Sequence, residues 1–186
     1  MYLALYMAVN KKYVLEREDL LDVFLESNIN LPHHKSSREP KDLLFLIEER
    51  SAVLIKRSSI LEKNISKLKE QYEFQHTTFL EYLSGCAIVA GHYPNARQIK
   101  NPDARISAYF KNYWEDESMR EIIIFTATIP WTLDIPQAIV HALLDKREEI
   151  SKLNETDKSK RLSYINSILQ QIIDEGAVLL PEDKLL

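Results

Sequence analysis

The chain has 186 residues, which allows one large domain or two small ones. A hydrophobic fraction of 45%, a charged fraction of 28% and only three glycines predict a mainly helical globular protein. The net charge of −4 argues against a nucleic-acid binder overall, because neutralising phosphates requires a surplus of Lys and Arg.

The single cysteine, Cys86, excludes an internal disulfide and a cysteine-based zinc site. It lies in an apolar helical run, so a buried core role is favoured over a reactive thiol. No apolar stretch approaches the roughly 20 residues of a membrane span, and the N-terminus lacks the basic region of a signal peptide. We therefore expect a cytoplasmic protein without a membrane partner. Residues 1–7 have the pattern of an amphipathic helix entered halfway, which predicts that the chain is part of a longer polypeptide.

The first half of the chain predicts helices interleaved with short strands. In chain order, we expect a helix at 2–9, a strand at 13–15, helices at 18–26 and 40–50, and strands at 53–55 and 72–76. Residues 27–40 are expected to form a loop. This order is that of a winged helix, in which a helix-turn-helix core is backed by a β-hairpin wing. A capping box formed by Thr78 and Glu81 then predicts a helix that ends near Gly91, with Phe79, Leu80 and Leu83 on its buried apolar face.

From Pro94 onward, the apolar spacing is helical throughout. Asn101 and Pro102 predict a helix start, and further helices are expected around 119–125, from 134 and over 159–174. Short connections favour antiparallel neighbours. The predicted architecture is mainly α: a winged-helix domain at residues 1–92, followed by a domain of antiparallel helices at residues 93–186.

His76 is the candidate binding residue. In the predicted strand, Tyr72, Phe74 and His76 share one face, and two large apolar side chains suggest that this face points inward. A helix begins directly afterwards, where the backbone favours an anion and an imidazole can donate to a phosphate oxygen. The alternative is a half-buried histidine hydrogen-bonded to a backbone carbonyl, and the residues by themselves favour it.

The remaining candidates predict neither catalysis nor a metal site. His33 and His34 lack further ligands at suitable spacing, and His141 is expected to be packed within an apolar helix. His92 follows a helix end, where its charged form would suit the dipole. Adjacent carboxylates such as Glu48 and Glu49, or Glu148 and Glu149, diverge by about 100° around a helix and are assigned to solvated faces. The three glycines cannot build a P-loop, so the chain is not expected to be an autonomous NTPase.

Residues 72–85, with the sequence YEFQHTTFLEYLSG, resemble a signature of NACHT-type proteins of the STAND NTPase class. In that signature, an aromatic, a variable residue and a His precede a T/S-F-x-E-Y/F run. Residues 46–54 are similar to the family segment "ERSGLL", with Ala52 in place of glycine, and residues 119–125 are similar to its "W-R-E-V" helix, with Met119 in place of Trp. Leu80 replaces the usual Gln, and the hairpin tip is longer than is typical. Together these segments cover about residues 1–130.

The resemblance implies a regulatory, non-catalytic part of a NACHT-type signalling ATPase. The ATPase core would lie upstream of Met1 in the same polypeptide and bind ADP or ATP with Mg, and sensor domains would lie downstream. His76 would contact the β-phosphate of ADP and hold the resting state, whereas the isolated chain would carry no cofactor. A homo-oligomer on activation is a further option, and antiviral defence is one setting in which bacterial members of the family serve.

Two other functions stay open. One is a helical protein–protein adaptor without any link to a nucleotide. The other is a winged-helix DNA-binding module, although the polar residues of the recognition helix at 40–50 carry a net charge of −1. The wing at 56–71 has five basic and two acidic residues, so a weak contact with phosphates stays open there.

Overall fold

The computed structural model describes residues 1–30, 39–60, 69–92, 106, 108–129, 134–153 and 156–177. The chain forms two compact units, Met1–Ser84 and Gly85–Leu186. The boundary lies inside helix α4 (Thr77–Val89) and not at residue 92, where the sequence pattern places it. The second half of α4 belongs to the helical unit because Gly85 lies close against residues 125 and 126 of that unit.

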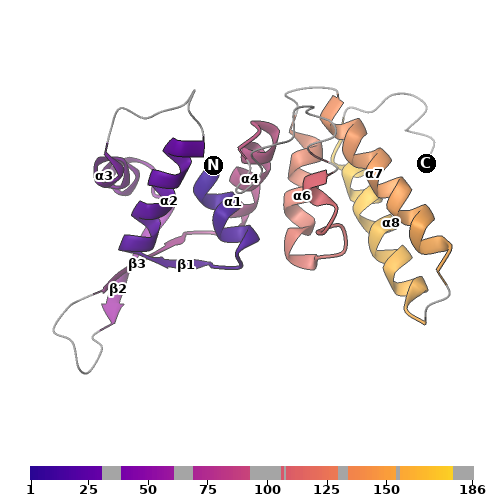
Figure 1. Ribbon diagram of the computed structural model, residues 1–186, viewed down its shortest axis with the longest axis horizontal. Helices are drawn as coiled ribbons and strands as arrows, with labels where there is room; N and C mark the ends of the chain where they lie inside the picture. The colour runs from indigo at the N-terminus through magenta and orange to yellow at the C-terminus, as the bar shows by residue number, and fades with distance from the viewer. Residues whose placement is uncertain are drawn as a thin grey trace. The chain divides into compact units, whose positions relative to one another are not determined.

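The first unit has the winged-helix order that the sequence predicts (Figure 1). Its elements before α4 are α1 (Tyr2–Val9), β1 (Val14–Glu16), α2 (Arg17–Asn30), α3 (Pro40–Arg50), β2 (Leu54–Ile60) and β3 (Lys69–Phe74). The strands form one antiparallel sheet in the order β1-β3-β2. The hairpin of β2 and β3 is the wing, and β3 occupies the centre of the sheet.

Strand bounds differ from the predicted ones. β2 continues to Ile60, whereas the apolar pattern predicts only residues 53–55. The extension begins with charged side chains, which the strand accommodates because the facing strand compensates their charge. Lys56, for example, lies opposite Tyr72 and forms an ion pair with Glu70. β3 ends at Phe74, two residues earlier than predicted. α2 continues to Asn30, so the predicted loop begins too early.

The core of the first unit is built around α1. This helix is buried on nearly all sides. The predicted amphipathic pattern of residues 1–7 is therefore wrong, because the helix has no polar face. The buried apolar side chains of this unit are Tyr2, Leu3, Ala4, Leu5, Met7, Ala8, Leu15, Leu20, Val23, Phe24, Leu44, Leu54, Tyr72 and Leu80. Every element of the unit contributes to this list, which indicates one continuous core.

The second unit is helical in its described residues. After the 3-10 turn η2 (Glu117–Met119), it contains α6 (Arg120–Thr128), α7 (Asp134–Ser151) and α8 (Lys158–Asp174). These three helices pack on one another, and α7 and α8 run antiparallel (Figure 1). α4 and α8 are each followed by a glycine with positive φ, Gly91 at 74° and Gly176 at 81°, as the sequence predicts.

Large apolar side chains fill the second unit. Ile122, Ile123 and Ile124 are fully buried on α6, and Phe110 packs against Trp114 with ring centroids 5.1 Å apart. Cys86 is buried, so its predicted core role is confirmed. Within the described residues, the structure has no helix of the length and apolar character that spanning a bilayer requires.

Candidate functional site

His76 lies between the central strand of the wing and the next helix. β3 ends at Phe74, and the amide of Gln75 makes a last sheet-like hydrogen bond to the Val53 carbonyl at 2.9 Å. Tyr72 is buried and Phe74 is half-buried, but the His76 side chain is exposed. The prediction that all three point inward is therefore wrong for His76, because the alternation of faces ends with the strand.

α4 begins at Thr77, directly after His76. The carbonyl of His76 accepts a hydrogen bond of 3.1 Å from the amide of Phe79, which closes the first turn. Thr78 is thus the second residue of the helix, so the predicted capping box, which needs Thr78 before the helix, is misplaced. His76 itself holds that place, next to backbone N–H groups that carry partial positive charge.

Two aromatic side chains of α4 are exposed. Phe79 is 41% exposed and Tyr82 is 44% exposed, whereas Leu80 is only 3% exposed. The prediction that Phe79 belongs to the core is therefore wrong, since Leu80 takes the inward position. The rings of Phe79 and His76 are in contact, with centroids 5.7 Å apart and planes inclined by 48°.

A polar network anchors the strand that leads to His76. The Tyr72 hydroxyl donates to Glu48 Oε1 on α3 at 2.5 Å, and burial raises the pKa of Tyr72. Glu70 on the same strand pairs with Lys56 and, at 3.3 Å, with Arg17 on α2. The hydrogen bond from Lys56 is the main reason why the pKa of Glu70 lies below its usual value. β3 is thereby tied to both flanking helices and to β2. The sequence places Glu48 on a solvated face and does not indicate this contact.

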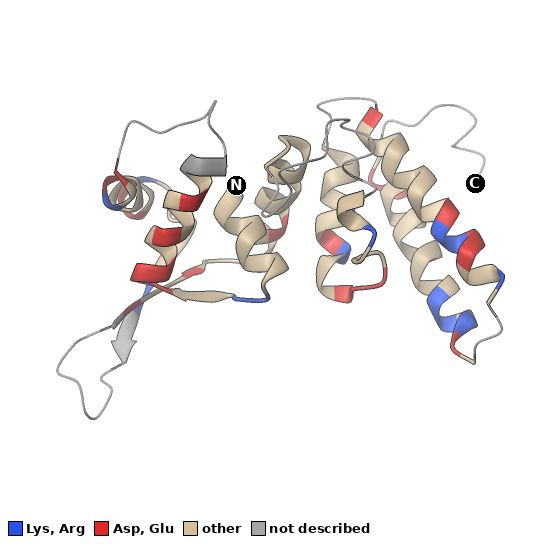
Figure 2. Cartoon of the chain, viewed as in Figure 1, with Lys and Arg blue, Asp and Glu red and all other residues tan. Residues whose placement is uncertain are grey.

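Two basic residues of the wing, both on β2, are paired with acidic residues of β3. Lys56 pairs with Glu70, and Arg57 pairs with Glu73 at 2.6 Å. Lys63 and Lys67 lie outside the described residues. On the helix-turn-helix side, Figure 2 shows acidic residues along α2, and the exposed positions of α3 include Asp42, Glu48 and Glu49. This charge arrangement is unfavourable for binding to a DNA backbone.

The other histidines have different surroundings. His33 and His34 lie outside the described residues. His92 is buried after the end of α4, and its amide donates to the Ala87 carbonyl at 2.8 Å. His141 is exposed on α7, so the prediction that it is packed is wrong. Among the described residues, no cluster of three or more His, Cys, Asp or Glu side chains could hold a metal ion.

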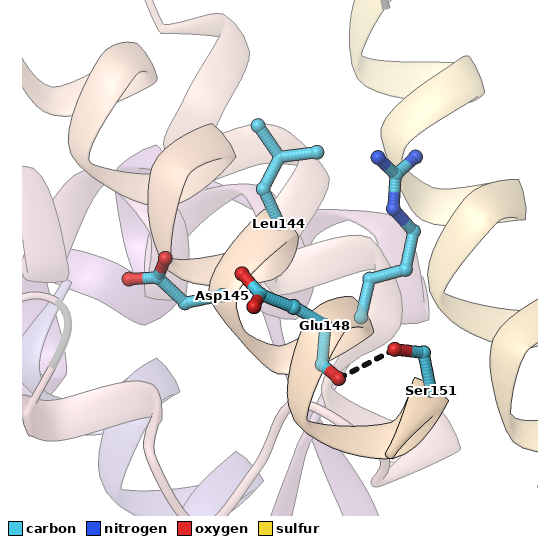
Figure 3. Close-up of a pocket in the computed structure, with 5 residues that line it drawn as sticks. Leu144, Asp145, Glu148 and Ser151 are labelled. Carbon is cyan, nitrogen blue, oxygen red and sulfur yellow. Dashed lines mark hydrogen bonds between the residues drawn. The ribbon is translucent and has the colours of Figure 1, made fainter.

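A shallow pocket lies on α7 (Figure 3). It is lined by Leu144, Asp145, Arg147, Glu148 and Ser151. The Ser151 hydroxyl donates to the backbone carbonyl of Glu148 at 2.7 Å, and the carboxylate of Glu148 pairs with Lys152 at 2.6 Å. The lining comes from one helix, and Glu148 and Ser151 are engaged locally, so this pocket gives no indication of a catalytic arrangement.

No known protein family matches the chain, and no curated protein is detectably related to it. The NACHT-type resemblance therefore stands on the motif at residues 72–85, on the weaker matches around it and on their order in the chain.

Proposed function

We propose that this chain is a regulatory, non-catalytic part of a NACHT-type signalling ATPase. In this proposal, His76 senses the nucleotide held by an upstream ATPase core, and the two units relay the nucleotide state to a C-terminal sensor. The observation that carries the proposal is the exposure of His76 at the start of α4. A residue that reads a nucleotide bound by another domain has to present its side chain outward, whereas a structural histidine would be buried against a partner.

The electrostatics of this position suit a phosphate. α4 has 13 residues, and the partial positive charge at its N-terminus favours an anion near His76. A hydrogen bond from the imidazole to a charged phosphate contributes about 1.5–3 kcal/mol. The contact stabilises the resting state only by the amount by which it is stronger there than in the active state. If it forms only in the resting state, it would shift the equilibrium between the two states by roughly ten- to a hundredfold.

The cofactor and partners follow from the same proposal. ADP or ATP with Mg belongs to the upstream core, and this chain contributes one side chain that contacts a phosphate of the nucleotide. The partner is that core within the same polypeptide, with a homo-oligomer on activation as an option. The setting is cytoplasmic signal transduction, with antiviral defence as one role that the resemblance suggests.

The charge distribution speaks against the DNA-binding alternative. Arg57, a candidate for contacts with phosphates, is already paired with Glu73, and Asp42 and Glu49 are exposed on the would-be recognition helix. A groove-binding helix with this charge would meet repulsion from the phosphates. The adaptor alternative makes a different prediction about the gene.

The coding sequence upstream of Met1 distinguishes the remaining alternatives. We expect a P-loop motif within the preceding few hundred codons of the same reading frame, because the proposal requires an ATPase core there. A start codon at Met1 without such an upstream domain would contradict the proposal and favour an adaptor.

A further inference from the structure

We propose that Phe79 is a positioning residue that holds the imidazole of His76 in the orientation needed to reach a phosphate. This inference rests on the proposed function of His76 and adds a second residue to that site. Phe79 would not touch the nucleotide. It would act by limiting the orientations that the exposed imidazole can adopt.

The geometry of the first turn of α4 brings the two rings together. His76 directly precedes the helix, and the hydrogen bond of 3.1 Å from the Phe79 amide to the His76 carbonyl holds the two residues within one turn of each other. The ring centroids lie 5.7 Å apart with planes inclined by 48°, which is within the range of favourable aromatic contacts. An imidazole at the exposed end of a strand would otherwise sample several rotamers.

The exposed fractions of the side chains on α4 distinguish a positioning role for Phe79 from a role in the core. Leu80 is the residue of this turn that packs inward, at 3% exposure, while Phe79 remains 41% exposed. A large apolar side chain kept at the surface beside the sensing residue contributes little to the core of its own unit. Its ring contact with His76 gives a reason for its presence there.

The contact itself can be measured in the chain by nuclear magnetic resonance. The ring protons of His76 are identified by their loss in His76→Gln. We expect Phe79→Leu to shift these resonances, Phe79→Tyr to preserve them, and Phe45→Leu to leave them unchanged. Phe45 provides a matched control because it is 59% exposed on α3 and receives the same substitution. Unchanged His76 resonances in Phe79→Leu would overturn the inference.

The function of the contact is tested by ADP dissociation from the full-length polypeptide that includes the ATPase core. We expect His76→Leu to accelerate dissociation roughly ten- to a hundredfold. Phe79→Leu should accelerate it roughly two- to tenfold, since an aromatic contact contributes less than a hydrogen bond to a phosphate. The Phe79→Tyr and Phe45→Leu variants should release ADP at the wild-type rate.

The outcomes separate the two proposals. If His76→Leu releases ADP at the wild-type rate, the proposed function fails and the positioning role fails with it. If His76→Leu accelerates release but Phe79→Leu does not, only the positioning role is overturned. An equal acceleration by Phe45→Leu would also overturn it, because the effect would then reflect any exposed aromatic side chain.

Discussion

At the scale of single residues, neighbouring side chains at the start of α4 have different surroundings. Phe79 is 41% exposed and contacts His76, while Leu80 is 3% exposed and belongs to the core. The apolar character of these two residues is evident from the sequence, but their roles depend on the phase of the helix. The sequence pattern places both residues on the buried face of the helix, and this prediction holds for Leu80 but not for Phe79. Adjacent side chains diverge by about 100° around a helix, so the structure buries only one of the two.

Alanine substitutions at these two positions should therefore lower the free energy of unfolding by different amounts. We expect Leu80→Ala to lower the free energy of unfolding by about 2–5 kcal/mol, because it removes buried methyl groups and leaves a cavity. Phe79→Ala should lower it by less than about 1 kcal/mol, since its ring is largely at the surface. Urea unfolding of both variants measures the difference. A larger loss for Phe79→Ala than for Leu80→Ala would show that the helix face is wrongly assigned.

At the scale of elements, the sequence predicts the helices better than the strands. α1, α3 and the start of α7 agree with their predicted bounds because their apolar spacing or proline signals are local. The predicted length of β2 is too short, because its polar half forms a strand only through pairing with β3, which follows much later in the chain. The prediction that His76 points inward failed for a related reason, since the alternation of faces persists only while the strand is paired.

Within the second unit, the close approach of α4 and α6 depends on a glycine. A Cβ atom at Gly85 would lie 3.1 Å from the Phe125 Cβ and 3.2 Å from the Thr126 backbone nitrogen. We expect Gly85→Ala to lower the free energy of unfolding by about 1–3 kcal/mol, because overpacking outweighs the better helix propensity of alanine. Asn166→Ala on the exposed face of α8 is the control and should change it by less than about 0.5 kcal/mol. A stabilised Gly85→Ala variant in chemical unfolding would contradict this packing.

An ion-pair network joins the elements of the helical unit. Glu115 accepts hydrogen bonds from Arg161 on α8 at 2.5 and 2.9 Å and lies 3.4 Å from the Lys146 ammonium on α7. The hydrogen bond from Arg161 is the main reason why the pKa of Glu115 lies below its usual value of 4.5. The sequence did not indicate this network, because its members lie far apart in the chain.

The pH dependence of stability should reveal the contribution of Glu115. A carboxyl whose pKa is lowered by folding stabilises the protein above its unfolded pKa, and this contribution is lost as the pH falls through the folded pKa. We expect Glu115→Gln to be less stable than wild type by about 1 kcal/mol at pH 7, with the difference disappearing in acid. Glu148→Gln removes an exposed pair and should follow the wild-type profile. A Glu115→Gln difference that persists unchanged at low pH would contradict an electrostatic origin.

At the scale of the whole molecule, we propose that this chain senses the nucleotide and that an upstream core hydrolyses it. The sequence has three glycines and no P-loop motif, which predicts that this chain does not cleave ATP by itself. We expect the isolated chain neither to hydrolyse ATP nor to bind it tightly. Turnover that survives repeated purification and is abolished by a substitution in this chain would contradict this division of roles.

The central claim is that His76 holds a resting, ADP-bound state of a longer signalling polypeptide. The most direct measurement is the ADP content of that polypeptide after purification, compared between wild type and His76→Leu. We predict that the wild type retains ADP, and that His76→Leu loses most of it and signals without a trigger, because the variant cannot donate to the phosphate. A stably folded His76→Leu variant that keeps its ADP and stays silent would contradict the claim.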